Sequence, residues 1–578
     1  MKILSKNKIA MCVGAVLGTA AIVPSAYALS FAADGLGDSL SNYYTTHNGN
    51  ATLINYTNTS DRTIAMRVRL HEYRNSRSWD FTVILSPYDV WNATIADGGS
   101  LGPVIYTGDE SCTIPAISRD AANPTVLATT GFLDAIAGDG GPQNVDRLKQ
   151  GYVNAIVMGS KTAGNGVGLE PDSCAMETAR FTSQANNAWD QLINQAPVPD
   201  ITALNGFLTT GGYPEYTNNA IKGVFNVLNV PLGQNAAQGM DTLADFFARG
   251  TASAPYATAA SGANPASTVP QYPAFATTNV PPVTGGNPKN LVTLQLHPTN
   301  IPLSSGLTGE QRYLASFFLP TQASANTAAF FVNADNSIAT NRALPVVSAR
   351  AGAMSVAFLH QATDVINMWT ALQNEAAWDT ATDIVIMADV KKFFVDGPAV
   401  PGDNPLQGRY KWTPGLPVTD VMGNGVATAP FSERFGVPTA GLSCDPVSWD
   451  IWDREENWDP QDPRFSPQPW GLALCFETNV IGFNGVSALR APVDQRYNID
   501  TIFANGWIDI NLISEANRYT ATWGATAGTM AFPFAGLPVA SWGFTTRVAD
   551  SGLNEAVSFP SALLRNPPTP TLGTVTLP

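Results

Sequence analysis

Charged side chains are scarce in this 578-residue chain, because Asp, Glu, Lys and Arg together make up only 13% of it. The usual share in globular proteins is roughly 25%. Long surface helices and coiled coils depend on many oppositely charged pairs, so the composition excludes an architecture built mainly from them. Hydrophobic residues still reach 44%, which is enough to bury cores and argues against a disordered chain. Length alone predicts two to four domains.

Basic residues are the scarcer of the two kinds of charge. The chain has 31 Lys and Arg against 46 Asp and Glu, for a formal net charge of −15. Nucleic-acid binding depends on clustered basic side chains that neutralise phosphates, so the balance excludes nucleic acid as a partner.

Long apolar runs are also missing, and no stretch of 18 consecutive apolar residues predicts a transmembrane helix. The nearest is a 15-residue run, 9–23, which follows Lys2, Lys6 and Lys8 and precedes Ala26-Tyr27-Ala28. This order is typical of a secretory signal peptide, which we predict over 1–28. Its cleavage removes three lysines and no acids, taking the formal charge from −15 to −18. We therefore expect a secreted protein of the cell surface or extracellular space.

Cysteine is rare, and the even number left after the signal peptide predicts two disulfides in an oxidising compartment. These four residues are Cys112, Cys174, Cys444 and Cys475. Three connectivities are possible. We favour Cys112 with Cys174 and Cys444 with Cys475, because each pair is close in sequence and each falls in a different half. A zinc site is disfavoured, since there is no C-x-x-C and no nearby histidine.

Alternating polar and apolar residues predict a mainly β protein, with two sandwich-like domains, a few packed helices and long loops. The predicted domains are 29–250, with a helical insertion, and 291–578. Between them, 251–290 is rich in Pro, Ala and Thr, and is either a linker or a long surface loop. The clearest strands are 64–70, 81–85, 90–95 and 152–158 in the first half, and 291–296, 384–387, 472–480, 507–512 and 539–546 in the second. Helices are predicted from 182 or 183 to 193, over 243–247 and, most clearly, over 356–372.

One segment matches the G-x-S-x-G pattern of serine hydrolases, at residues 98–102. That chemistry requires a strand, a sharp turn and a helix. Here both flanks are strand-like, so a hairpin turn is favoured and we expect no enzyme.

Seven acids fall in the 18 residues from Asp445 to Asp462, with tryptophans among them. The candidate metal ligands are Asp450, Asp453, Glu455, Glu456, Asp459 and Asp462, and the candidate binding residues are Trp449, Trp452 and Trp458. Clustered carboxylates are typical ligands of Ca²⁺. Carboxylates beside exposed rings are instead typical of sugar binding or glycoside hydrolysis. The third reading is a turn-rich loop whose tryptophans pack on the core. All three readings stay open.

Five arginines give the first strands a local positive charge: Arg62, Arg67, Arg69, Arg74 and Arg77. On the polar side of strands, they are expected to be solvated. A functional alternative is a basic face that contacts the acidic face of a neighbouring copy, or an anionic polysaccharide.

Several short motifs spread over most of the chain form a family signature. They include GLGDSL at 35–40, DFTVILSPYDVW at 80–91, DREE at 453–456, CFETNVI at 475–481 and GLPV at 536–539. With these motifs the chain resembles a family of secreted proteins from Gram-negative, largely marine gammaproteobacteria, some of which are thought to form a surface layer and enter the biofilm matrix. The resemblance brings no catalytic residues with it.

The resemblance implies a non-enzymatic structural protein that self-assembles on the cell surface. Its partners would be further copies of itself, with the outer-membrane surface or a polysaccharide as anchor. Ca²⁺ is a possible cofactor, because divalent cations can bridge acidic surfaces. The alternative is a secreted carbohydrate-binding protein or glycoside hydrolase that uses the acidic, Trp-rich stretch 445–470.

Overall fold

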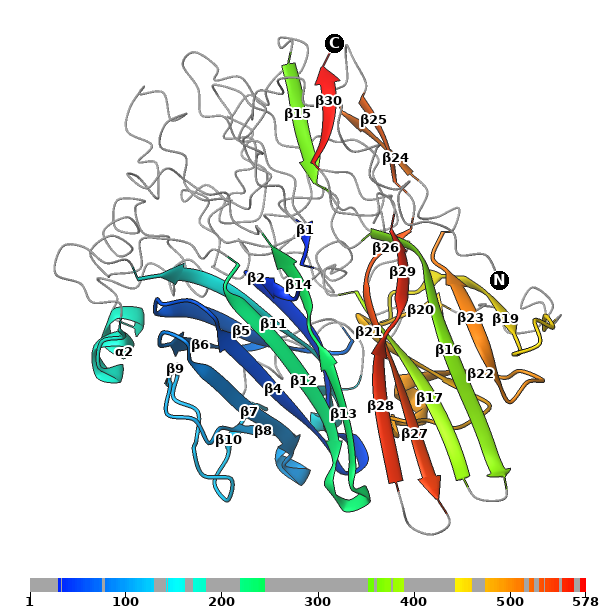
Figure 1. Cartoon of the computed structure of the whole chain (residues 1–578), viewed down its shortest axis with the longest axis horizontal. Helices are drawn as coiled ribbons and strands as arrows, with labels where there is room; N and C mark the ends of the chain where they lie inside the picture. The colour runs from blue at the N-terminus through cyan, green and yellow to red at the C-terminus, as the bar shows by residue number, and fades with distance from the viewer. Residues whose placement is uncertain are drawn as a thin grey trace, which may run out of the picture.

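The computed structural model describes residues 30–32, 34–74, 78–128, 142, 144–161, 170–182, 219–244, 352–357, 361–375, 378–388, 442–459, 473–513, 519–523, 530–534, 536–549, 554–565 and 572–577. These residues form a mainly β protein, as predicted, with two β-rich halves side by side (Figure 1). The predicted signal peptide, the predicted linker 251–290 and the predicted strand 291–296 lie outside this part of the chain. No helix in the described ranges has the length and apolar character needed to cross a membrane.

The first half is a sandwich of two seven-stranded sheets. In spatial order, the first sheet contains β1 (Ser30–Phe31), β14 (Asp241–Ala244), β3 (Ser39–Thr45), β11 (Gln150–Ser160), β5 (Ile64–Glu72), β6 (Ser78–Leu85) and β9 (Cys112–Ile114). The second sheet contains β10 (Thr125–Val126), β8 (Pro103–Tyr106), β7 (Val90–Asp97), β4 (Asn50–Asn58), β12 (Ile221–Asn229) and β13 (Gln234–Gly239), with β2 (Leu36–Gly37) beside β12. All pairings in these two sheets are antiparallel.

The two sheets of the first half pack through alternate residues of their strands. Every second residue of β4 is buried, and the residues between them are partly exposed, which is the period expected of a sheet with one core face. Aromatic rings join the layers: Trp91 lies 5.6 Å from Phe81 of the first sheet and 6.0 Å from Tyr56 of its own sheet. The G-x-S-x-G segment is the turn between β7 and β8, as predicted, with a short 3-10 helix η2 (Gly99–Leu101).

The second half is built around a ten-stranded sheet, called here the third sheet. Its main path is β19 (Ser448–Trp452), β23 (Asn505–Asn511), β16 (Gln361–Glu375), β17 (Trp378–Met387), β21 (Thr478–Phe483) and β22 (Arg496–Ile499). Branches are added by β26 (Leu537–Pro538), β27 (Ala540–Ala549), β28 (Asn554–Pro560) and β29 (Ala562–Arg565). Three further pairs are β15 (Gly352–Ala357) with β30 (Leu572–Leu577), β18 (Asp445–Pro446) with β20 (Ala473–Leu474), and β24 (Tyr519–Trp523) with β25 (Met530–Phe534).

The predicted helix over 356–372 is wrong, because this segment contains the end of β15 and most of the long strand β16. The first part of β16 pairs with β23 on one edge and with β29 on the other, and its end forms a hairpin with β17. Val365 and Trp369 face the core while Met368 is exposed, a period of two rather than 3.6. Residues that are β-branched or aromatic favour strands once both edges have partners, and those partners are far away in sequence.

Helical elements are short and few among the described residues. They are α2 (Cys174–Thr182) and the 3-10 helices η1 (His47–Gly49), η2, η3 (Val145–Lys149), η4 (Val230–Leu232) and η11 (Val493–Gln495). The helix predicted from 182 or 183 to 193 meets α2 only at its first residue, and 183–193 lie outside the described ranges. The helix predicted over 243–247 is wrong at its start, because 243 and 244 belong to β14.

Two disulfides join the cysteines in the pairing that the sequence favours, Cys112 with Cys174 and Cys444 with Cys475. The first ties the edge strand β9 to α2, and the second ties the residue before β18 to the residue after β20. Their presence indicates that the chain matures in a non-reducing compartment.

One apolar cluster runs through both halves. One cluster of buried residues includes Leu40 and Phe225 of the first half together with Val385, Val480 and Trp542 of the second. At the contact, the Phe225 ring lies 5.6 Å from Trp542. Tyr43 lies 5.9 Å from Phe544 of the same strand, β27. The domain division at 251–290 stays a prediction, but the two halves pack as one body.

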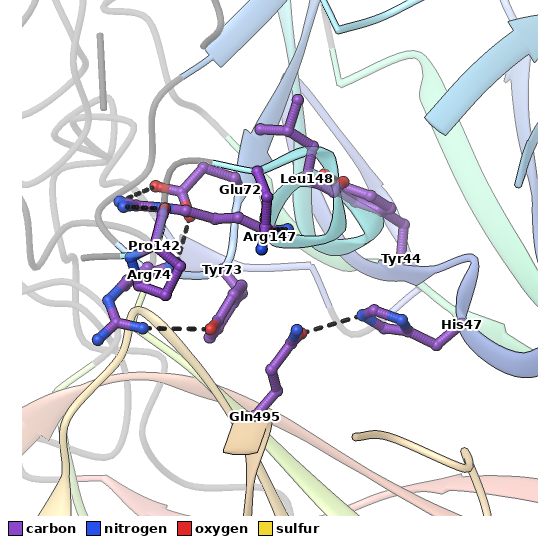
Figure 2. A network of polar contacts seen from close by, with 10 residues as sticks. Tyr44, His47, Glu72, Tyr73, Arg74, Pro142, Arg147, Leu148 and Gln495 are labelled. Carbon is purple, nitrogen blue, oxygen red and sulfur yellow. Dashed lines mark hydrogen bonds and ion pairs between the residues drawn. The ribbon is translucent and has the colours of Figure 1, made fainter. Parts of the chain in front are cut away.

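Hydrogen bonds surround this apolar contact, and Figure 2 shows part of them. The amides of Glu477 and Thr478 both donate to the carbonyl of Tyr73, at 3.0 and 2.9 Å. His47 and Gln495 contact each other through Nε2 and Oε1 at 3.0 Å. Burial lowers the pKa of His47, which favours the neutral ring at this contact.

A buried ion pair lies where β5 leaves the first sheet (Figure 2). Arg147 of η3 donates from Nε and Nη2 to the two carboxylate oxygens of Glu72, at 3.0 and 3.1 Å. Both side chains are almost fully buried. The next residues carry the chain to the second half, where Arg74 lies over the Phe476 ring at 5.2 Å.

The arginines of the first strands do not form a solvated basic face. Arg69 and Arg74 are buried, and Arg67 is partly buried and donates to Thr82 Oγ1 at 3.0 Å. Arg62 is nearer the surface, beside Asp61, and Arg77 lies outside the described residues. The expectation of solvation is wrong for Arg69 and Arg74 because both faces of the first sheet are covered at β5, where only Arg67 is not buried.

Replacing Glu72 by Gln should lower the free energy of unfolding by about 3–5 kcal/mol, because it removes the negative charge that is paired with the buried Arg147 guanidinium. Urea unfolding followed by tryptophan fluorescence would measure the loss. Arg547→Gln is the matched control, since its pair with Glu555 is exposed and should contribute at most about 1 kcal/mol. Equal losses in the two variants would contradict the assigned role of the buried pair.

A second buried carboxylate, Asp383 of β17, generates a pH dependence. Its Oδ2 accepts from Ser487 Oγ at 2.6 Å and from the Leu489 amide at 2.7 Å, while Oδ1 has no partner. Burial raises the pKa of Asp383 to about 6. An unfolded Asp ionises near about 3.9. Between these values the folded chain binds more protons, so this residue makes stability fall as the pH rises from about 4 to about 6.

Asp383→Asn should remove this contribution, because the amide does not ionise while its oxygen can still accept both hydrogen bonds. Relative to the parent, the variant should gain about 3 kcal/mol of unfolding free energy between pH 4 and pH 7. Urea unfolding at several pH values would measure the difference, with the exposed Asp494→Asn as control. A difference that stays constant with pH would show that Asp383 ionises normally in the folded chain.

Candidate functional site: tryptophans and carboxylates on the third sheet

The acidic, Trp-rich stretch forms the edge of the third sheet and the turn that follows it. Asp450 lies in the edge strand β19, which pairs with β23. Asp453 and Glu455 lie in the turn after it, which brings the backbone of residue 458 back beside that of Trp452.

The carboxylates of this stretch are directed to different hydrogen-bond donors. Asp450 accepts from Trp458 Nε1 at 3.2 Å. Asp453 holds the turn together by accepting from the amides of Glu455 and Asn457 and from the Asn457 side chain, and this side-chain bond is the main reason for its lowered pKa. Asp459 is buried and accepts from Thr501 Oγ1 and the Ile502 amide.

The six predicted metal ligands are not gathered into one site by the described residues. Glu455 and Glu456 are exposed in the turn, and Asp462 lies outside the described ranges. Within those ranges, no group of three or more His, Cys, Asp or Glu side chains is placed to hold a metal ion. Of the described carboxylates of the stretch, Asp450, Asp453 and Asp459 accept hydrogen bonds from nearby groups of the chain.

The tryptophans give a different result, because two of the three predicted binding residues lie on the outer face of the sheet. Trp452 is stacked on Trp507, its cross-strand partner in β23, with ring centres 3.8 Å apart and planes at 10°. On the far side, Trp507 pairs with Met368 of β16, whose side chain is 70% exposed. Trp458 is 52% exposed and lies beside Trp452. We call Trp458, Trp452, Trp507 and Met368 the tryptophan ridge.

Trp449, the third predicted binding residue, does not belong to the ridge. Strand side chains alternate between faces, so Trp449 lies on the opposite face from Trp452. Its cross-strand partner, Ile510, is buried.

A glycine in β23 allows the stacked pair to form. A Cβ on Gly506 would lie 1.8 Å from the carbonyl oxygen of Trp452 and 2.8 Å from its carbonyl carbon. Because these are backbone atoms, no side-chain movement can relieve the clash. Gly506 thus lets the end of β19 approach β23 and sets Trp452 against Trp507.

Three carboxylates lie beside the tryptophan ridge on the same face. Asp450 of β19 and Asp509 of β23 are direct cross-strand partners, and Asp364 of β16 is diagonal to Asp509. Burial raises the pKa of Asp509 to about 6, and the negative charges of Asp364 and Asp450 add to this effect. Asp509 Oδ1 is buried and has no hydrogen-bond partner. We call these three residues the acidic group.

The sequence patterns identified three of the seven residues in the tryptophan ridge and the acidic group. These three are Trp452, Trp458 and Asp450. The others come from distant segments, with Trp507 and Asp509 about 50 residues later and Asp364 and Met368 about 85 residues earlier. The alternation in 507–511 predicts a strand and places Trp507, Asp509 and Asn511 on one face, which was the available signal. The missing step was the pairing of β23 with β19 and β16.

Comparison with protein-family models, curated proteins and solved structures found no match for the chain. The resemblance to the surface-layer family therefore stays a prediction.

Gly506→Ala should separate β19 from β23 and unstack Trp452 from Trp507. Stacked indoles couple electronically, so the near-ultraviolet circular dichroism of the tryptophans should decrease while the far-ultraviolet signal of the sheets is kept. Gly239→Ala is the matched control, because a Cβ on this strand glycine meets no atom within 4 Å. An unchanged tryptophan signal in Gly506→Ala would contradict the close approach of the two strands.

Proposed function

We propose that this protein is a secreted structural protein that self-assembles into a cell-surface layer and contributes to the biofilm matrix. The support comes from the predicted signal peptide, the two disulfides, the common core of the two halves and, above all, the outer face of the second sheet.

The outer face of the second sheet is almost free of charge, and this observation carries the proposal. Twelve outward-facing residues lie on its three central strands. They are Ala51, Leu53, Asn55, Thr57, Val90, Asn92, Thr94, Ala96, Lys222, Val224, Asn226 and Leu228. Lys222 is the only ionisable side chain among them. We call this surface the neutral face.

Regular cross-strand pairing holds the residues of the neutral face in rows. Asn55 lies between Asn92 of β7 and Val224 of β12, and Leu53 lies between Thr94 and Asn226 in the next row. Amide, hydroxyl and small apolar groups can pack and hydrogen-bond against the same face of another copy.

Electrostatics explain why copies would meet at this surface. The chain carries a formal net charge of −15, so two copies repel each other through their acidic regions. Contact through the neutral face separates those charges and buries few ionised groups, whose desolvation opposes association. The neutral face, with one ionisable side chain among twelve, is therefore a surface through which identical acidic molecules can meet with little charge repulsion.

A lattice also needs a rigid unit, and the shared core supplies one. The ring contacts of Phe225 with Trp542 and of Tyr43 with Phe544 fix the first half against the second. Surfaces on the two halves therefore keep a fixed orientation relative to each other, as a regular lattice requires. Contacts that do not close into a ring can extend a sheet of molecules.

Calcium enters this proposal only as a bridge between acidic surfaces of neighbouring copies. The arginines Arg69 and Arg74 are buried, which leaves the basic-face contact without support from them. A divalent cation would instead screen the repulsion between acids such as Glu455 and Glu456, which are exposed.

A second candidate function, carbohydrate binding, is supported by the tryptophan ridge and the acidic group. The hydrolase form of this idea relied on Asp450, Asp453 and Glu455. Of these, Asp453 is engaged in its own turn, and its neighbour Glu455 is exposed. Binding is the form that the geometry favours, because rings and carboxylates share one face.

Self-assembly is tested by sedimentation of the mature protein over a range of concentrations with Ca²⁺, and by electron microscopy of the arrays. Asn55→Asp places a negative charge in the middle of the neutral face with little change in shape. It should raise the concentration needed for assembly at least tenfold, because like charges at an interface repel.

Asn505→Asp is the matched control, since it makes the same exchange on the other half. Microscopy of the native surface with and without a chelator tests the role of calcium. A parent protein that stays monomeric at high concentration with Ca²⁺, or equal assembly of Asn55→Asp and parent, would overturn the proposal.

A further inference from the structure

We propose that the outer face of β16, β23 and β19 is a binding site for a polysaccharide that carries protonated amino groups. The tryptophan ridge provides the contact for the sugar rings, and the acidic group provides the contact for the amines. The inference rests on carbohydrate binding, the second function proposed above, and does not depend on self-assembly, because this site is on the other half of the molecule from the neutral face.

The shape of the tryptophan ridge fits an extended ligand. Neighbouring strands in a sheet lie about 4.7–4.9 Å apart, so the row from Trp452 through Trp507 to Met368 spans roughly 10 Å. Trp458 extends it beyond the edge strand. The exposed apolar atoms of Trp458 and Met368 are what a linear chain of sugar rings covers, since the C–H faces of sugars pack on aromatic and apolar surfaces.

The acidic group determines the charge of the ligand. Asp450, Asp509 and Asp364 lie on three adjacent strands, and their mutual repulsion is part of the reason why Asp509 holds its proton more strongly than a free carboxyl. A bound ammonium group would lie between carboxylates and would relieve this repulsion. The same arrangement disfavours an anionic polysaccharide, because each uronate or sulfate would add to the negative charge.

Ammonium groups also interact with the rings. A cation over an indole face is attracted by the quadrupole of the ring, and tryptophan is the most effective of the aromatic residues in this contact. The tryptophan ridge therefore favours both sugar rings and cations, while the acidic group favours cations only. An amino-sugar polymer satisfies both requirements along its whole length.

Asp509 provides the group that a ligand can satisfy. Its Oδ1 is buried against the sheet without a hydrogen-bond partner, and an unpaired buried acceptor costs free energy. The residue as a whole is partly exposed, so an amine of a sugar at the ridge can approach the Asp509 carboxyl group from the solvent side. The charged groups placed around Asp509 are Asp450 from β19 and Asp364 from β16, so a donor with positive charge is preferred.

The test is titration of the whole mature protein with a glucosamine oligosaccharide, followed by calorimetry and by tryptophan fluorescence. Trp458→Ala and Asp509→Asn should each weaken binding about tenfold or more, since a charge-assisted hydrogen bond contributes about 1.5–3 kcal/mol. Asp494→Asn, an exposed acid on η11, is the matched control and should bind as the parent does. Added salt should weaken binding, because the contact is between charges.

Three comparison ligands decide whether the inference stands. The N-acetylated oligosaccharide and a uronic-acid oligosaccharide should bind at least tenfold more weakly. If the N-acetylated oligosaccharide binds as tightly as the amine form, the acidic group does not select for a positively charged ligand and the inference is overturned. It is also overturned if a lysine-rich peptide of equal charge displaces the oligosaccharide at equal concentration, which would indicate a protein partner. The titration measures binding of the oligosaccharide to single molecules in solution. A negative result would therefore contradict this inference and leave the self-assembly proposal unaffected.

Discussion

The packing of aromatic rings between β12 and β27 is the interaction on which the rest of the structure depends. Phe225 contacts both Trp542 and Phe544 across the two halves, and these residues belong to the same core cluster as the interiors of both sheets. Without this contact the two β-rich halves would lose the apolar packing that they share. With it, the neutral face and the tryptophan ridge become two surfaces of one rigid body, and a charge pattern on the molecule acquires a fixed geometry.

Buried polar groups make that contact specific. Apolar packing has little directionality, whereas the two amides that donate to the Tyr73 carbonyl and the contact of His47 with Gln495 allow few relative positions of the halves. Glu72 directly precedes Tyr73 in the chain, so its pair with Arg147 holds in place the backbone that accepts these hydrogen bonds. Such pairs add little net stability when complete and cost much when one partner is lost. Their contribution here is to fix the arrangement of the two halves.

Short-range patterns predicted the strands well and the site only in part. The alternation in β5 and β6, the turn at 98–102 and the cysteine pairs depend on neighbours in sequence, and these predictions were confirmed. The helix over 356–372 was wrong because β16 owes its conformation to β23 and β29, which are encoded about 140 to 200 residues later. The same distance hid Trp507 and Asp509 from the reading of 445–462. Burial of Arg69 was hidden too, since alternation shows that a strand has two faces but not that both are covered.

The low charge of the chain leaves some regions of its surface almost neutral and others acidic. A surface with many charged residues of both signs interspersed has few faces that are clearly neutral or clearly acidic. Here the neutral face has one ionisable side chain among twelve, while the acidic group places three carboxylates on three adjacent strands. In the proposals made above, identical acidic molecules meet at the first surface and repel each other at the second, where a ligand of opposite charge binds. On these proposals the scarcity of charge separates contact between copies from contact with a polysaccharide, and the shared core fixes the two surfaces relative to each other.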